Sequence, residues 1–200
     1  MKKIIIILCV ACVMIGILSA CSEYGPILKN EISPKKLTTN EQEIVDLLSS
    51  DTQEILLFDY KTEDAYKTVS FWVEFYENGE LIDRPSGIES YNDEAKPQDG
   101  QLAVLITHDE GVTWAFTKDE DGSRTSHTGE ILEIDYASLA RGYRPINNPV
   151  EIEAGKEIVL YTSIYSNDGI SLFSDMQRYI EEPNLLSGYP YVQIIKCRFE

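Results

Sequence analysis

The chain has 200 residues, and 34 aspartates and glutamates outnumber its 17 lysines and arginines, which gives a formal net charge of −17. That length suffices for one good hydrophobic core. The negative charge excludes nucleic acid as the expected partner, because phosphate groups bind basic side chains, and it predicts repulsion from anionic lipid head groups.

The first twenty residues have the order of a cleavable export signal. A basic start is followed by an uncharged run over residues 4–18, which is too short to span a bilayer comfortably because a spanning helix takes about 20 apolar residues. The run closes on Leu-Ser-Ala-Cys, ending at Cys21, and this close resembles the lipobox of bacterial lipoproteins at all four positions. That resemblance implies lipid attachment to the Cys21 sulfur and cleavage just before it.

This signal sets the expected organisation and location of the chain. Residues 1–20 are the lipoprotein signal peptide, and residues 21–36 are a lipidated flexible tether, because they are polar, contain two prolines and show no period. Residues 37–200 are then a single β-rich extracytoplasmic domain. The lipid on Cys21 would hold it at the bacterial cell membrane.

A helix is the first predicted element of the domain. Asn40 can cap this helix, with Glu43 reaching back as a capping box. Ile44, Leu47 and Leu48 then recur at helical spacing. The sequence therefore predicts an N-terminal helix that ends soon after Leu48.

Strands are predicted from there on. A short apolar run covers residues 54–60, and residues 67–76 alternate, with four apolar side chains on one face. Asn78-Gly79 is a hairpin signal, since both residues tolerate a positive φ. A brief returning strand is expected over residues 80–83.

The middle of the chain predicts a loop and a second hairpin. Residues 84–100 hold two prolines, two glycines and several acids, which is typical of a loop. Residues 101–107 and 112–118 form the expected hairpin, and alternation places Trp114 and Phe116 inward.

One further helix is predicted among the strands of the C-terminal part. An apolar stripe over residues 172–180 indicates this short helix, which ends before Pro183. The expected strands cover residues 130–135, 150–153, 157–165 and 189–199.

Short strands separated by turns favour antiparallel sheets over a parallel one. The expected fold is mainly β: an antiparallel β-sandwich of about seven to nine strands, immunoglobulin-like in outline. It should carry an N-terminal helix and one short helix before the last strand. The antibody-type cysteine pair is absent, so the likeness is one of architecture.

Three stretches in the first half of the domain carry a resemblance to known proteins. Residues 37–48 (LTTNEQEIVDLL), 54–61 (EILLFDYK) and 69–74 (VSFWVE) resemble uncharacterised lipoproteins of Clostridia and related gut bacteria. The resemblance implies a small extracytoplasmic β-rich domain. It brings no activity and no site residues.

Motifs for catalysis or cofactor binding do not stand out. His108 and His127 have no histidine or cysteine close by in the sequence, as a zinc site requires. Residues 119–122 are similar to the start of a calcium loop with Glu130 at its twelfth position, but the middle of that loop lacks acids, so a plain acidic turn is favoured. Cys197 lies in an apolar-rich segment and is expected to be a small buried hydrophobe. No metal and no cofactor are predicted.

Aromatic side chains supply the candidate binding residues. Trp72 and Tyr76 share the polar face of one strand with Glu74 between them, and Tyr161 and Tyr165 repeat the pattern on another. Exposed aromatics beside polar groups make platforms for sugars or peptide side chains. The alternative is that the helices or the second sheet cover these faces.

Two classes of function follow. The favoured one is a membrane-anchored binding module that captures a surface glycan, peptide or protein partner, because the chain has neither a Gly-x-Ser-x-Gly nucleophile motif nor a glycine-rich phosphate loop. The alternative is a carboxylate-dependent hydrolase acting on envelope or dietary polymers. That enzyme would need two close acids in a cleft, at least one of them with a raised pKa.

Overall fold

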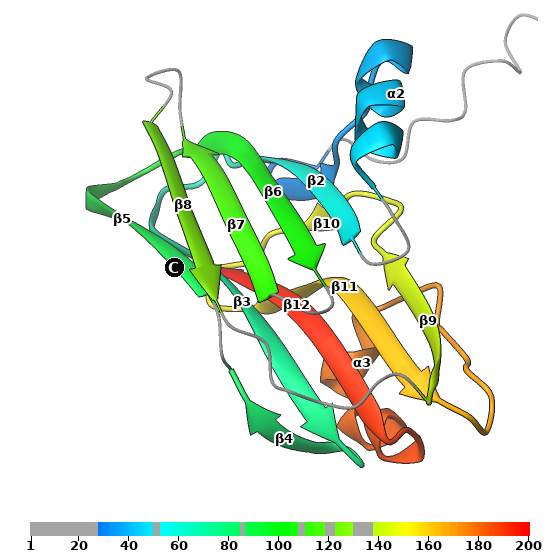
Figure 1. The fold of residues 1–200 in the computed structure, drawn as a ribbon. Coiled ribbons are helices and arrows are strands. Elements are labelled where there is room, and N and C mark those ends of the chain that lie inside the picture. The colour runs from blue at the N-terminus through cyan, green and yellow to red at the C-terminus, as the bar shows by residue number, and fades with distance from the viewer. Residues whose placement is uncertain (1–27, 50–52, 85–86, 108–110, 119–122, 130–137) are drawn as a thin grey trace, which may run out of the picture.

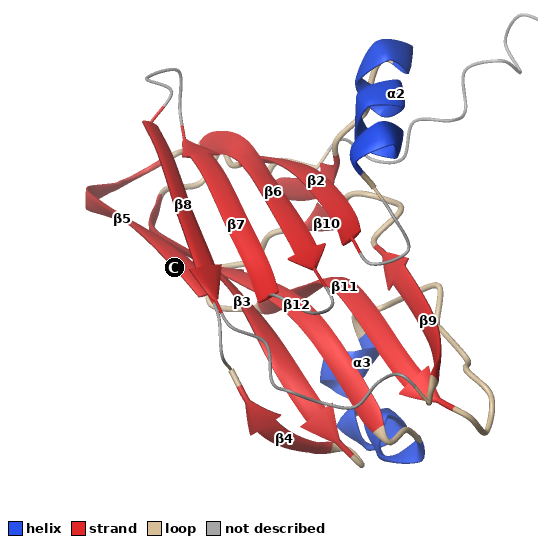
Figure 2. Cartoon of the chain, viewed as in Figure 1, coloured by secondary structure: helices blue, strands red, loops and turns tan. Residues whose placement is uncertain are grey.

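The computed structural model describes residues 28–49, 53–84, 87–107, 111–118, 123–129 and 138–200. These residues form two antiparallel sheets packed face to face, with few helices (Figure 1, Figure 2). The prediction of a mainly β antiparallel sandwich is confirmed. None of the helices in these ranges has the length and apolar character needed to cross a membrane.

The first sheet has six strands in the order β10-β1-β2-β6-β7-β8, and every neighbouring pair is antiparallel. The β6–β7 hairpin was predicted, and its Trp114 and Phe116 side chains are buried as expected. The strands are β10 (Val150–Glu151), β1 (Glu31–Pro34), β2 (Gln53–Lys61), β6 (Asp99–Thr107), β7 (Gly111–Lys118) and β8 (Ser123–Gly129).

The second sheet follows the order β4-β3-β12-β11-β9, and β5 also pairs with β3. Both β4 and β5 lie along the same side of β3, since β5 pairs with its first half and β4 with its last residues. The strands are β4 (Glu80–Asp83), β3 (Tyr66–Glu77), β12 (Tyr191–Phe199), β11 (Glu157–Ser166), β9 (Ala140–Pro145) and β5 (Gly87–Lys96).

The described residues thus contain twelve strands, more than the seven to nine expected. The prediction of a loop over residues 84–100 is wrong, because β5 and the start of β6 lie there. Only two side chains of β5, Ile88 and Asn92, are buried, so the strand lacks the apolar alternation that marks a half-buried strand. The strand predicted over residues 130–135 lies outside the described residues.

The expected tether over residues 21–36 is wrong in its last part, because the sandwich already begins there. β1 lies between β2 and β10 in the first sheet. Just before it, the buried Asn30 side chain accepts hydrogen bonds from the backbone N–H groups of Glu63 (2.8 Å) and Asp64 (2.9 Å) and donates to the Asp64 carboxylate (2.7 Å). A four-residue strand is too short for its period to be read from the sequence.

Helix α2 (Thr39–Leu48) begins earlier than predicted. Thr38 caps it: its hydroxyl accepts from the backbone N–H of Glu41 (3.4 Å), and the Glu41 carboxylate accepts from the backbone N–H of Thr38 (2.8 Å). The expected capping box of Asn40 and Glu43 is therefore wrong by two residues. Both residue pairs fit the same motif, and only the backbone conformation at the first turn distinguishes them.

The helix predicted over residues 172–180 is wrong in its bounds. The structure has a single turn, α3 (Arg178–Glu181), followed by the 3-10 helix η1 (Pro183–Gly188). Met176, Tyr179 and Leu186 of this region are buried. Helix α3 lies against the face of the second sheet that points away from the first sheet (Figure 1).

Aromatic rings fill the space between the two sheets at one end of the sandwich. Phe71 of β3 and Phe116 of β7 lie with ring centroids 5.4 Å apart, and Tyr60 of β2 stacks on Phe116 at 5.7 Å. Phe199 of β12 contacts Tyr60 at 5.6 Å. The rings come from both sheets, so their burial stabilises the packing of one sheet on the other.

The predicted turn between β3 and β4 is confirmed, and Gly79 is under two constraints there. Its φ is +85°, and a Cβ at this position would lie 2.7 Å from the Ser187 Cα. Gly155 has a similar φ of +72° but open space around it. An alanine at either position carries the strain of the left-handed region, roughly 1–2 kcal/mol, and only the one at position 79 also collides with η1.

Gly79→Ala is therefore expected to lower the free energy of unfolding more than Gly155→Ala does. Chemical denaturation of the two variants measures the difference. Equal losses would show that the turn conformation alone, without the contact to η1, determines the need for glycine at position 79.

Candidate functional site

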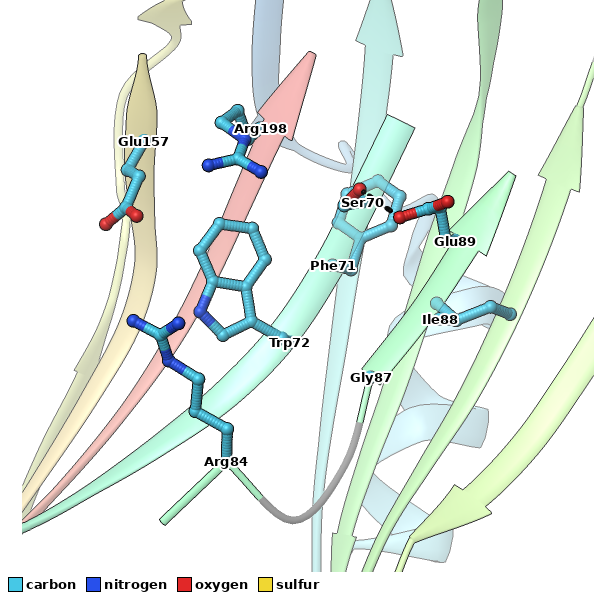
Figure 3. A pocket seen from close by; sticks show the side chains of 9 residues that line it. All are labelled: Ser70, Phe71, Trp72, Arg84, Gly87, Ile88, Glu89, Glu157 and Arg198. Carbon is cyan, nitrogen blue, oxygen red and sulfur yellow. Dashed lines mark hydrogen bonds between the residues drawn. The ribbon is translucent and has the colours of Figure 1, made fainter. Parts of the chain in front are cut away.

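A hollow of about 330 Å³ lies on the outer face of the second sheet, at its β5 side (Figure 3). Its volume is within the range of small-ligand sites, which starts at roughly 300 Å³. Besides Phe71, Gly87 and Ile88, the residues that line it are Ser70 and Trp72 of β3, Arg84 after β4, Glu89 of β5, Glu157 of β11 and Arg198 of β12.

Strand alternation determines that Trp72 points to this outer face. Phe71 points toward the first sheet, where it meets Phe116. Successive side chains of a strand point to opposite faces, so Trp72, Glu74 and Tyr76 point away from the first sheet. β12 runs antiparallel beside β3 with Lys196 opposite Trp72, which brings Lys196 to the same face.

Glu74 is the centre of this face, and its side chain is fully buried at 0% exposed. One carboxylate oxygen accepts from the Trp72 indole N–H (2.9 Å) and pairs with the Arg84 guanidinium (2.6 Å). The other accepts from the Tyr76 hydroxyl (2.6 Å) and pairs with the Lys196 ammonium (2.7 Å). This contact set, the Glu74 network, satisfies the buried charge from four directions.

The Glu74 network keeps the carboxylate ionised. Burial acts to raise the pKa of Glu74, but the hydrogen bonds from Lys196, Tyr76 and Trp72 outweigh it and lower the pKa. In return, burial and the bond to Glu74 raise the pKa of Tyr76. The Tyr76 hydroxyl therefore stays protonated at neutral pH and donates to Glu74.

A pH-dependent contribution to stability follows from the lowered pKa of Glu74. The unfolded chain takes up this proton more readily than the folded one, so the contribution is complete above the ordinary glutamate pKa, roughly 4.3, and is lost as the pH falls through the lower folded value. We expect the difference in unfolding free energy between the natural chain and Glu74→Gln to be largest at neutral pH and to shrink below about pH 4.

Urea unfolding at a series of pH values from 7 to 3 measures this difference. Glu80→Gln on the exposed β4 is the matched control. Its unfolding free energy should stay close to that of the natural chain at every pH in the series. A Glu74→Gln difference that does not change with pH would show that the carboxylate charge contributes nothing.

Two arginines flank Trp72 in the hollow, one at each side of the indole (Figure 3). Arg84 reaches it from the end of β4. Arg198 reaches it from β12, with its guanidinium carbon 5.8 Å from the centre of the indole. Glu157 lies beside Arg198 and pairs with Lys196 (2.9 Å), whereas Glu89, on the other side of Trp72, accepts from the Ser70 hydroxyl (3.2 Å) (Figure 3). The site thus offers an aromatic surface between cationic and anionic groups.

The predicted aromatic platforms differ in where the structure places them. Trp72 and Tyr76 are half-buried, with their polar atoms bound to Glu74, and only Trp72 lines the hollow. Tyr161 and Tyr165 are buried at 0% and 3% exposed. They point toward the first sheet, so the expectation of a second surface platform from these two tyrosines is wrong.

Tyr161 instead belongs to a polar cluster between the sheets. Its hydroxyl donates to Glu54 of β2 (2.6 Å) and accepts from Arg141 of β9. Arg141 also pairs with Glu54 (2.7 Å) and donates to the Ser163 hydroxyl (2.8 Å). The cluster joins one sheet to the other across the interior. Burial is the main reason that the pKa of Tyr161 lies well above its ordinary value.

Tyr161→Phe is expected to lower the free energy of unfolding by about 1–3 kcal/mol, because Glu54 and Arg141 each lose a hydrogen-bond partner in a poorly solvated place. Tyr143→Phe is the matched control. The Tyr143 ring stacks on Tyr161 but is 53% exposed, so loss of its hydroxyl should change stability by less than about 0.5 kcal/mol. Equal effects in chemical denaturation would contradict a special role of the Tyr161 hydroxyl.

The other candidates from the sequence have different outcomes. Cys197 is fully buried, as predicted, and burial raises the pKa of its thiol, which leaves it a poor nucleophile. Among the described residues, no group of three or more metal-ligating side chains comes together. The calcium-loop-like segment and His108 lie outside the described residues, as does the His127 side chain.

Most of the site was not predicted. Trp72 was found from alternation, and Glu74 was noted only as the residue between two aromatics. Lys196, Glu157 and Arg198 come from strands more than 80 positions away along the chain. The available signal was local: a glutamate on a long strand with an aromatic two residues to either side is well placed to accept their N–H and O–H donors.

The fold and the hollow define a small β-sandwich domain with a charged aromatic site on one outer face. Residues 31–199 match the YgaN domain family, so the chain belongs to that family. The match begins at β1 and ends in β12, and it therefore covers both sheets. No curated protein and no solved structure matches the chain significantly.

Proposed function

We propose that this chain is a lipid-anchored extracytoplasmic binding module that takes its ligand in the hollow over Trp72. The anchor is the lipid on Cys21, which the lipobox resemblance implies, and residues between Cys21 and Asn30 link it to the sandwich. The strongest support for the binding role is the fixed position of the indole. Its N–H is bound to a fully buried carboxylate that three further groups hold in place. A rigid, partly exposed tryptophan binds with little loss of side-chain entropy.

The anchor is tested by Cys21→Ser in the bacterial host. We expect this variant to lose both labelling by a fatty acid and recovery in the membrane fraction, because a thioether-linked lipid needs the sulfur of this residue. Cys12→Ser, within the export signal, is the matched control and should keep both. Full membrane recovery of Cys21→Ser without label would contradict lipid anchoring.

The binding role is tested with Trp72→Ala in the full-length lipidated protein in detergent micelles. The variant is expected to lose binding to isolated envelope material and to immobilised glycans that the natural protein retains. Tyr91→Ala, at an exposed aromatic of β5, is the matched control. Binding that is unchanged in Trp72→Ala would remove the hollow from consideration as the site.

The alternative proposal is hydrolysis by a carboxylate pair, and the same glycan samples test it. Among the described residues, the two carboxylates with a shifted pKa are Glu41 and Glu74, and both pKa values are lowered, whereas a general acid needs a raised pKa. We therefore propose binding over catalysis. Release of shorter products from any glycan, abolished by Glu157→Gln or Glu89→Gln, would reverse that order.

A further inference from the structure

The charges at the hollow point to the kind of ligand that it takes. The chain has only six arginines against 34 acidic residues, yet Arg84 and Arg198 lie in the same hollow at either side of Trp72 (Figure 3). Guanidinium groups match the geometry of a carboxylate, to which they can donate two parallel hydrogen bonds. Two of them beside one aromatic ring favour an anionic group on the ligand.

Both arginines have capacity left for such a group. Arg84 is 56% exposed, and its ion pair with Glu74 uses one of the five N–H groups of a guanidinium. The Arg198 side chain is 37% exposed, and its ion pair with Glu200 (3.3 Å) engages the Nε, which leaves the terminal nitrogens of the guanidinium for a ligand. A ligand carboxylate can therefore reach guanidinium nitrogens of both arginines.

The acidic side chains of the hollow specify the rest of the ligand. Glu89 and Glu157 each have one oxygen engaged, by the Ser70 hydroxyl and by Lys196 respectively. Their other oxygens are acceptors for hydroxyl donors. They also repel a doubly charged phosphate more than a singly charged carboxylate. The indole face accommodates the C–H face of a sugar ring.

Resting on the binding role proposed above, we infer that the ligand is a glycan with a carboxylate-bearing sugar. The ring lies on Trp72, its carboxylate binds Arg198 and Arg84, and its hydroxyls donate to Glu89 and Glu157. A neutral sugar would bring no anionic group to the remaining N–H donors of the two guanidinium groups. A simple anion would leave the indole and the two glutamates unused.

The test compares acidic glycans with neutral counterparts, using the full-length lipidated protein in micelles and isothermal titration calorimetry. The acidic probes are oligogalacturonate, sialyllactose and glycan strands that contain muramic acid, which represent plant, host and bacterial-wall sources. The neutral probes are galacto-oligosaccharides and lactose. We expect at least one acidic probe to bind roughly tenfold to a hundredfold more tightly than its counterpart, since a hydrogen bond to a charged group contributes about 1.5–3 kcal/mol.

Arg198→Gln should reduce the affinity for the acidic probe to about that of the neutral one. The matched control is Arg178→Gln, whose side chain pairs with Glu182 on α3 away from the hollow. Neutral probes that bind as well as acidic ones, or an Arg198→Gln variant with unchanged affinity, would overturn the acidic-sugar inference. In either case a loss of binding in Trp72→Ala would leave the hollow as the site.

The binding role itself fails in a distinguishable way. If no acidic or neutral glycan binds with dependence on Trp72, both the hollow as a glycan site and the acidic-sugar inference are wrong. If inorganic phosphate or a phosphorylated sugar competes better than the acidic probes, the hollow binds anions in general and the carboxylate inference is wrong.

Discussion

Lys196→Met is expected to lower the free energy of unfolding by about 3–5 kcal/mol, because it removes the main counter-charge of a buried carboxylate. Lys196 is 7% exposed, and its ammonium binds Glu74 at 2.7 Å and Glu157 at 2.9 Å. Methionine keeps most of the volume of the lysine stem. The loss therefore reports the uncompensated charge on Glu74 rather than a cavity.

Two companion variants separate the buried charge from general effects of lysine loss. Lys156→Met removes a pair of similar length to Glu153, but both of those side chains are more than half exposed, so its effect should be below about 0.5 kcal/mol. The double variant Glu74→Gln/Lys196→Met leaves no fully buried charge unpaired and should be more stable than Lys196→Met alone. Equal losses for the two lysine variants in chemical denaturation would contradict the central role of the Glu74 network.

Phe71→Ala is the second substitution with a large expected effect, about 3–5 kcal/mol of unfolding free energy. The ring is 1% exposed and lies against Phe116 at 5.4 Å and against Tyr60 and Phe199 at 6.4 Å. Three rings from two sheets cannot collapse into the space without moving a strand. The variant therefore loses both the transfer free energy of the ring and the contacts around the cavity.

Phe173→Ala is the matched control for Phe71→Ala. Phe173 also contacts an aromatic ring, Tyr179 at 5.6 Å, but it is only partly buried at the outer face of the second sheet. Phe173→Ala should therefore lower the free energy of unfolding clearly less than Phe71→Ala does, and urea unfolding of both variants measures the two values. Equal costs would show that burial between the sheets is not what makes the Phe71 ring important.

The alternation of β3 and the turn after it were predictable because both depend on neighbours in the sequence. Side chains two residues apart share a face of a strand, and Asn78-Gly79 favours a tight turn whatever surrounds it. The same reasoning placed Trp72 and Tyr76 together on the face opposite Phe71. It could not say how deeply that face is buried, because burial depends on what packs against it.

The misplaced elements show where local signals end. β1 and β5 have too little apolar alternation to be distinguished from loops, and pairing with long neighbouring strands is what makes them strands. Tyr161 has the same local pattern as Trp72 but points into the sandwich, where Glu54 lies 107 positions away in the sequence. Only the packing of the two sheets distinguishes these two aromatic residues.

The sequence by itself therefore determined the strand-rich class of this protein, its main hairpins, and the resemblance to lipoproteins at Cys21, because these depend on periods, turns and motifs within short stretches. The tertiary structure alone decided that Glu74 is a buried charge and that Arg84, Lys196 and Arg198 meet around it and Trp72. The physical reason is that antiparallel pairing of β3 with β12 and β4 brings together side chains whose separation along the chain carries no information about their distance in space.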